Sequence, residues 1–201
     1  MQSSLFNSEP INILPHHGDA VLYTGFFSVE ESDHYFNSLL NEINWKQEPI
    51  KIFGKEVMQP RLTAWYGETG KAYTYSGITM QPHAWTKSLQ AIKQKIEQVA
   101  VVTFTSALLN LYRNGNDSMG WHRDNEKELG NAPVIGSVSF GATRTFQFRN
   151  YKTKSDIKSL EPTHGSFLLM RCEKNHYWEH RVPKTNQPVT ERINITFRVI
   201  E

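Results

Sequence analysis

Two histidines and one aspartate are the residues in this sequence best suited to chemistry. One residue separates His122 from Asp124, and His180 follows 56 residues after Asp124. In an extended segment, residues two apart point to the same face, so His122 and Asp124 can converge on one ion. Two imidazoles and one carboxylate leave three positions open on Fe(II), as non-haem iron oxygenases require. On its own the pair is more often a surface histidine beside a capping aspartate. Three other histidines compete with His180 for the third position: His83, His164 and His176.

The last stretch of the chain carries a second set of polar residues. Polar and apolar side chains alternate there, which predicts a strand with two different faces. One face would carry Arg192, Asn194, Thr196 and Arg198. Such a row is most often a solvated strand face. If it points into the protein instead, two buried guanidinium groups need an anion, and a small dicarboxylate would satisfy both. Asn110 and Tyr112 form a matching polar pair upstream.

A sheet must position these residues, and the sequence predicts an α+β fold. Period-two patterns predict strands over Ser106–Arg113, Val134–Phe140, Thr143–Asn150, Ser166–Arg171 and Arg192–Ile200. A turn at Gly141-Ala142 would make residues 134–150 a hairpin. Two helices precede these strands, one after a capping box at Ser28–Glu31 and one starting near Pro82. Helices followed by antiparallel strands favour N-terminal helices packed on a jelly-roll, or double-stranded β-helix, core.

Composition narrows the class of protein. The chain has 201 residues, 38% of them hydrophobic, which is enough for a core, and it contains no long apolar run. We therefore expect no membrane segment, and no signal peptide is apparent. The single cysteine, Cys172, suits a reducing compartment. The first 45 residues hold six acidic and no basic residues, so the remainder holds 22 basic and 14 acidic residues, a net charge of +8. This basic body favours an anionic partner.

Taken together, these motifs resemble the AlkB family of Fe(II)/2-oxoglutarate dioxygenases. The resemblance runs from about residue 45 to the C-terminus, and the Arg-x-Asn-x-Thr-x-Arg strand after the distal histidine is its most specific part. It implies that Fe(II) is held by His122, Asp124 and His180. It also implies that the carboxylates of 2-oxoglutarate are bound by Asn110, Tyr112 and Arg198, in a pocket lined by Arg192, Asn194 and Thr196. The implied reaction uses O₂ to hydroxylate an N-alkyl carbon, which leaves as an aldehyde.

The region before the strands resembles the nucleotide-recognition lid of the same family. Phe53-Gly54-Lys55 matches a finger that fills the gap left by a flipped base in duplex-acting relatives, although a half-buried hairpin tip has the same composition. By this resemblance, the substrate would be contacted by Phe53, Gly54, Lys55, Arg61, Tyr73, Thr74, Tyr75, Asn125, Glu126, Arg144 and Arg149. Two features depart from the family pattern. Asn125 replaces an acid of many relatives, and the basic segment 149–158 is shorter and spelled differently.

The sequence therefore predicts a single dioxygenase domain over residues 1–201. Its parts would be an acidic segment and helix (1–45), a lid and helix (46–100) and a jelly-roll core (101–201). The expected function is oxidative demethylation of 1-methyladenine- and 3-methylcytosine-type bases in single- or double-stranded DNA, with base flipping. Alternatives are the same chemistry on RNA or on a protein side chain, or a nucleic-acid-binding module without activity. We expect an intracellular monomer, cytoplasmic in a bacterium or nuclear in a eukaryote.

Overall fold

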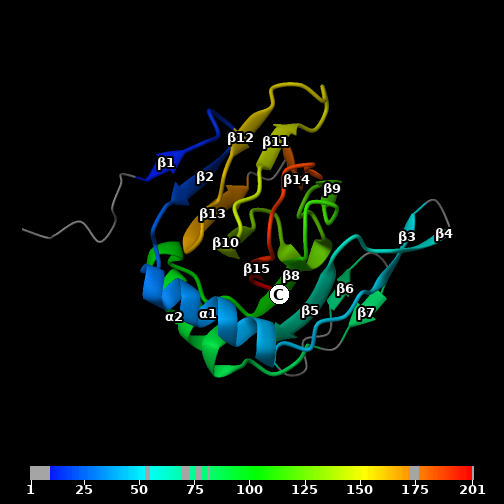
Figure 1. The fold of residues 1–201 in the computed structure, drawn as a ribbon. Coiled ribbons are helices and arrows are strands. Elements are labelled where there is room, and N and C mark those ends of the chain that lie inside the picture. Colours follow the sequence, from blue (N-terminus) through cyan, green and yellow to red (C-terminus); the bar gives the residue numbers. More distant parts are fainter. Residues whose placement is uncertain are drawn as a thin grey trace, which may run out of the picture.

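Two antiparallel β-sheets form the body of the protein, and two helices pack on the larger sheet (Figure 1). The structure is a computed structural model that describes residues 10–52, 55–68, 73–75, 78–80, 82–172 and 177–200. The large sheet has the order β1 (Ile11–Asn12), β2 (Gly18–Tyr23), β13 (Ser166–Cys172), β10 (Val134–Gly141), β15 (Arg192–Arg198), β8 (Ser106–Tyr112) and β5 (Leu62–Gly67). The small sheet has the order β12 (Lys158–Leu160), β11 (Phe146–Asn150), β14 (Trp178–Val182) and β9 (Met119–His122). The predicted α+β jelly roll is confirmed.

Both helices begin at a capping residue. Helix α1 (Val29–Glu42) follows Ser28, whose side chain accepts from the Glu31 backbone N–H while the Glu31 carboxylate accepts from the Ser28 N–H. The predicted capping box is thus confirmed. Helix α2 (Lys87–Ala100) starts later than predicted from Pro82, because Thr86 supplies the cap by accepting from the Leu89 N–H.

The large sheet buries a different set of residues on each face. In β15, Ile193, Ile195 and Phe197 belong to the core cluster that also contains the apolar faces of both helices. The alternate residues of β15 and β8 point between the two sheets, where Asn194 lies opposite Asn110 in register. The polar row of the last strand therefore faces inward, as its functional interpretation required.

The strand pairing corrects one prediction. Strand β10 pairs with β13 and β15, whereas β11 pairs with β12 and β14, so residues 134–150 are not a hairpin. The chain instead crosses from the large sheet to the small sheet after Gly141. This glycine has φ of +85°, and a Cβ atom there would lie 2.4 Å from the carbonyl oxygen of Glu191. Glycine is therefore required by the crossing itself.

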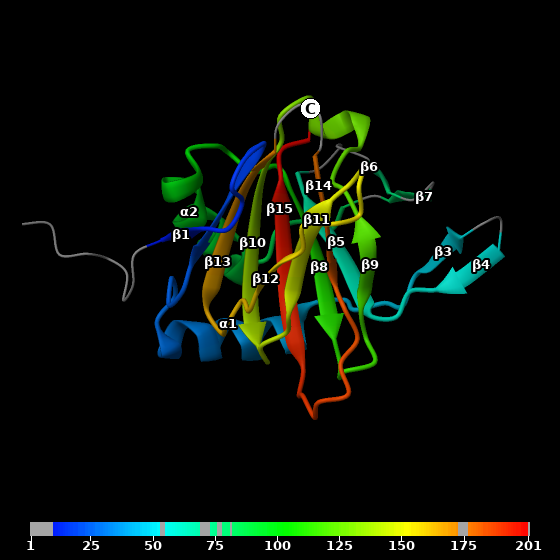
Figure 2. The ribbon, with the colours of Figure 1, turned by 90° about the horizontal axis from the view of Figure 1, so that it is seen from above.

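Two small hairpins extend from the side of the body where β5 and β9 lie (Figures 1 and 2). One consists of β3 (Pro49–Ile52) and β4 (Lys55–Met58), and the other of β6 (Tyr73–Tyr75) and β7 (Ile78–Met80). Between them in sequence, β5 joins the large sheet beside β8. None of the helices in the described ranges is long and apolar enough to cross a membrane.

Candidate metal centre and co-substrate pocket

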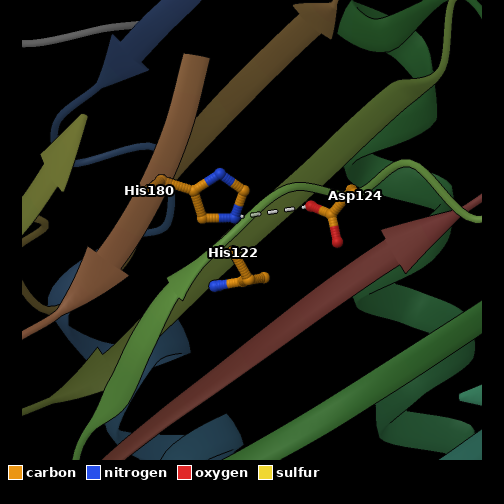
Figure 3. A group of neighbouring side chains, drawn as sticks. All are labelled: His122, Asp124 and His180. Carbon is orange, nitrogen blue, oxygen red and sulfur yellow. Dashed lines mark ion pairs between the residues drawn. The ribbon is translucent and has the colours of Figure 1, made fainter. Parts of the chain in front are cut away.

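His122, Asp124 and His180 meet between the two sheets (Figure 3). His122 ends β9, and it lies directly opposite His180 of β14 in the strand register. The potential ligand atoms of the three residues all lie within 4.8 Å of one another. His180 Nε2 and Asp124 Oδ2 are 3.5 Å apart, a separation that suits two ligands of one ion. The strand pairing thus supplies the third ligand that spacing alone could not identify.

The competing histidines are excluded by their positions or lie outside the described structure. His164 accepts a hydrogen bond from the Gly141 N–H and lies 3.2 Å from Asp33, next to helix α1. His83 is exposed and packs against Tyr66. His176 falls outside the described residues.

The two histidines are prepared to bind a cation as neutral imidazoles. His122 Nδ1 is 2.9 Å from the Gly120 carbonyl oxygen. Because a carbonyl only accepts, Nδ1 must carry the proton, and Nε2 keeps a lone pair for a metal. His180 packs nearly parallel to the ring of Phe146, with centroids 5.3 Å apart. Burial lowers the pKa of both imidazoles, that of His180 to about 3, so both are uncharged at neutral pH.

Asp124 supplies the negative charge of the site. Its side chain is 1% exposed, and Arg198 Nη2 donates to Oδ1 at 2.5 Å. Burial by itself would raise the pKa of this carboxyl, but the charge and hydrogen bond of Arg198, together with the neighbouring histidines, outweigh burial, and the pKa is well below its usual range. Oδ2 accepts no hydrogen bond from the described part of the chain. A buried anionic oxygen beside two neutral imidazole nitrogens is a donor set that fits Fe(II).

The co-substrate residues expected from the sequence line one cavity with this centre. They are Asn110, Tyr112, Asn194, Thr196 and Arg198. Asn194 is oriented by donating to Ser137 Oγ at 2.8 Å and to the Val138 carbonyl at 3.1 Å. Sequence reasoning missed Ser137 and its neighbour Ser139. The signal was available, because both serines alternate with apolar residues along β10, as the polar residues do along β15.

Arg192, the remaining expected co-substrate residue, does not line the cavity itself but lies beside Tyr112, which does. It is 1% exposed, and its guanidinium carbon lies 5.2 Å from the ring centre of Tyr112. Nη2 donates to Ser139 Oγ, but Nε and Nη1 find no acceptor within the described ranges of the chain. A buried guanidinium with donors left over can bind an anionic oxygen. The residues present therefore fit 2-oxoglutarate.

Two residues expected to contact nucleic acid are buried instead. Arg61 is 4% exposed and donates to Asn110 Oδ1 at 2.7 Å. It therefore supports a residue of the co-substrate cavity. Arg144 is 2% exposed and donates to the backbone carbonyls of Asn114, Asp117 and Pro183. Buried carbonyl and amide oxygens take up the donors of both residues in this structure, and a substrate contact by either residue stays a prediction.

The remaining expected substrate residues differ in how far the structure describes them. Phe53 and Gly54 lie outside the described residues. Tyr73, Thr74 and Tyr75 form strand β6, for which only the backbone is described. Lys55 and Asn125 are exposed, and Glu126 is half-buried just after the ligand Asp124. Arg149 lies on the outer face of the small sheet, where it donates to Glu179 at 2.5 Å.

Comparison with known proteins agrees with this site. Residues 19–198 match the family model described as the 2OG-Fe(II) oxygenase superfamily. The human alpha-ketoglutarate-dependent dioxygenase alkB homolog 3 is 43% identical over 188 residues, which are 89% of this chain and 65% of that protein. The human DNA oxidative demethylase ALKBH2 is 37% identical over 188 residues, 89% of this chain and 72% of that protein.

A solved structure shows the same fold. The structure of OsALKBH1 superimposes with a TM-score of 0.64 at 15% identity, over 90% of this chain and 96% of that chain. This chain spans just under two thirds of the length of the human alkB homolog 3. The chain therefore belongs to the 2OG-Fe(II) oxygenase superfamily and is AlkB-like, with a donor set that fits Fe(II) and a cavity that fits 2-oxoglutarate.

Proposed function

We propose that this enzyme is an oxidative demethylase that removes methyl groups from alkylated bases in DNA, of the 1-methyladenine and 3-methylcytosine type. The observation that carries the proposal is the inward-facing His122–Asp124–His180 centre in a chain 36–43% identical to proteins named alkB homolog 3 and DNA oxidative demethylase ALKBH2. The net charge of +8 on residues 46–201 suits a polyanionic substrate. An intracellular location, nuclear in a eukaryote, belongs to the same proposal.

The residues of the site would have different roles in this reaction. When bound, Fe(II), 2-oxoglutarate and O₂ supply the oxidising power: one oxygen atom hydroxylates the alkyl carbon, and the other enters the succinate that remains when CO₂ leaves. His122, Asp124 and His180 would hold the ion. Arg192 and Arg198 would orient the dicarboxylate, with Arg198 also fixing the Asp124 carboxylate. The hydroxylated product then loses its C–N bond, the nitrogen keeps the electron pair, and the hydroxyl proton leaves with formation of the aldehyde.

Recognition of the base would fall to residues close to the metal centre and to the hairpins. Glu126 follows Asp124 by two residues, and its carboxylate is an acceptor suited to an amino group or to a cationic methylated ring. Tyr73 and Tyr75 would contact the extruded base, and Phe53 would fill the gap left in the duplex. In this proposal, residues 46–100 contribute the lid and residues 101–201 the catalytic core.

Mass spectrometry of methylated oligonucleotides tests the proposal. Matched single-stranded DNA, double-stranded DNA and RNA are incubated with protein, Fe(II) and 2-oxoglutarate. We expect loss of one CH₂ unit from DNA that requires both additions and disappears in His180→Ala. If RNA is demethylated and DNA is not, the substrate assignment is wrong. If 2-oxoglutarate is consumed but no oligonucleotide changes mass, demethylation of nucleic acid is wrong while the family assignment stands.

The finger is tested separately. Phe53→Ala should slow demethylation of duplex DNA more than that of single strands, because only a duplex leaves a gap to fill after flipping. Lys55→Gln is the matched control: loss of a phosphate contact should weaken both substrates and reduce the salt dependence of binding. An equal loss on both substrates for Phe53→Ala would rule out the wedge.

A further inference from the structure

Strand β9, which carries His122, has few backbone contacts to hold it in place. It is the edge strand of the small sheet, next to β14. In the described structure it registers with β14 at His122–His180 and at Met119–Val182, with an irregularity between these pairs. Gly120 and Trp121 therefore face a single residue, Arg181, which is the pattern of a β-bulge. An edge strand with a bulge should be held by more than its backbone hydrogen bonds.

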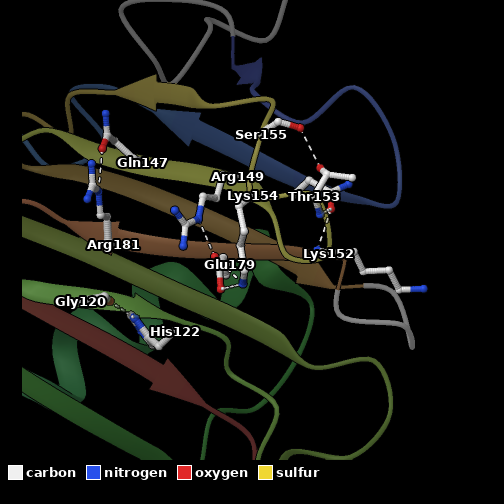
Figure 4. Close-up of polar contacts among 11 residues, drawn as sticks. Gly120, His122, Gln147, Arg149, Lys152, Thr153, Lys154, Ser155, Glu179 and Arg181 are labelled. Carbon is white, nitrogen blue, oxygen red and sulfur yellow. Dashed lines mark hydrogen bonds and ion pairs between the residues drawn. The ribbon is translucent and has the colours of Figure 1, made fainter.

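The side chains on the outer face of β9 supply that additional support. Trp121 points away from the cavity, and two arginines lie over its ring. The guanidinium carbon of Arg149, from β11, is 4.1 Å from the ring centre, and that of Arg181, from β14, is 4.4 Å. Each arginine is itself anchored, Arg149 by Glu179 at 2.5 Å and Arg181 by Gln147 at 2.8 Å (Figure 4). We call the packing of Arg149 and Arg181 on the ring of Trp121 the arginine clamp.

A second contact holds the residue on the other side of His122. Arg123 lies between the ligands His122 and Asp124, and its guanidinium carbon is 3.5 Å from the ring centre of Tyr151. Lys154 lies over the same ring at 4.2 Å and also pairs with Glu179. Both neighbours of His122 are therefore fixed on the outer face while His122 points inward.

We infer that Trp121 and Arg123 are positioning residues for the metal centre. They hold the bulged end of β9 so that His122 faces His180 and Asp124 before an ion arrives. A loose edge strand would have to become ordered when the metal binds, and the entropy cost of that ordering would weaken metal binding. Groups behind metal ligands commonly change metal affinity by about 10- to 100-fold. The inference concerns the metal site alone and does not depend on the substrate.

The test measures Co(II) binding to the metal-free protein, without 2-oxoglutarate or nucleic acid. Calorimetry gives the affinity, and the visible absorption of the bound ion reports the ligand geometry. Trp121→Leu should weaken Co(II) binding by about tenfold and change the absorption band, because the ligand geometry is loosened. Trp121→Phe keeps an aromatic face for the arginines and should stay within about twofold of the parent. Should Trp121→Leu fail to fold, Arg123→Gln replaces it, with Arg123→Lys as the conservative rescue.

Lys95→Met is the matched control. Lys95 also makes a cation–π contact, 4.7 Å from the ring centre of Phe27, and an ion pair with Glu31, but it lies on helix α2, which packs on α1 and the large sheet. It should lose stability without changing Co(II) affinity. An equal loss of affinity in Lys95→Met and Trp121→Leu would overturn the inference. Unchanged Co(II) binding in Trp121→Leu would overturn it as well, and weaker oligonucleotide binding by that variant would then make the outer face a nucleic-acid contact instead.

Discussion

Replacing Arg198 with methionine should destabilise the metal-free protein far more than loss of one hydrogen bond would. Arg198 and Asp124 are 2% and 1% exposed, and Nη2 to Oδ1 is 2.5 Å. Two unit charges about 4 Å apart interact by about 4 kcal/mol at an effective dielectric constant near 20. Removing one partner leaves a buried carboxylate without its counter-charge, which typically costs about 3–5 kcal/mol. We therefore expect the free energy of unfolding to fall by that amount.

The assay is a double-mutant cycle in urea with a chelator present, because a bound cation would neutralise Asp124 and mask the effect. The variants are Arg198→Met, Asp124→Asn and the double variant. The double variant removes both charges, so it should be more stable than the sum of the single losses predicts, by about 2 kcal/mol. Losses that add to within about 0.5 kcal/mol would refute the reasoning, since the two groups would then not interact.

Three further outcomes follow from the structure. Gly141→Ala should lower the melting temperature by several degrees, because Gly141 has φ of +85° and an added Cβ would meet Glu191. Gly120→Ala is the control and should not lower it, because an added Cβ there has no atom within 4 Å. Equal shifts of the melting temperature in the two variants would contradict the geometry. Asp117→Asn should cost about 1–3 kcal/mol near neutral pH. Burial opposes ionisation of Asp117, but Arg113 outweighs it and lowers the pKa, so its contribution is present above about pH 4 and fades below it. The stability gap between parent and variant should therefore narrow towards about pH 3, and a constant gap would argue against this assignment. His180→Ala should abolish measurable Co(II) binding in calorimetry, and retained affinity would reject the ligand assignment.

The pocket was predictable where a local pattern determines which side of a strand a residue occupies. Period-two alternation placed Asn194 and Arg198 on one face of β15 and the apolar residues on the other. The capping box predicted the start of α1 for the same reason, since it depends on atoms within one turn. Residues that share a strand or a helical turn constrain one another directly, so their arrangement follows from the sequence.

Contacts between distant segments could not be predicted in this way. Gly141 was expected to close a hairpin, but β10 and β11 belong to different sheets because each finds partners far away in sequence. Arg144 was expected to contact the substrate, but its guanidinium is buried because it donates to carbonyls of two loops, one between β8 and β9 and one after β14. The arginine clamp on Trp121 could not be predicted either, because it requires β9, β11 and β14 to lie side by side.

The sequence by itself determined which side chains can bind a metal and a dicarboxylate, because residue type and alternation are local properties of the chain. Residue spacing left His83, His164 and His180 as candidates, and the tertiary structure brings His180 to the centre, as the family resemblance implied, since its strand lies opposite His122. It also decided the surroundings of the arginines, because packing buries Arg61 and Arg144. Pairing and burial depend on long-range packing, and that information is distributed over the whole chain.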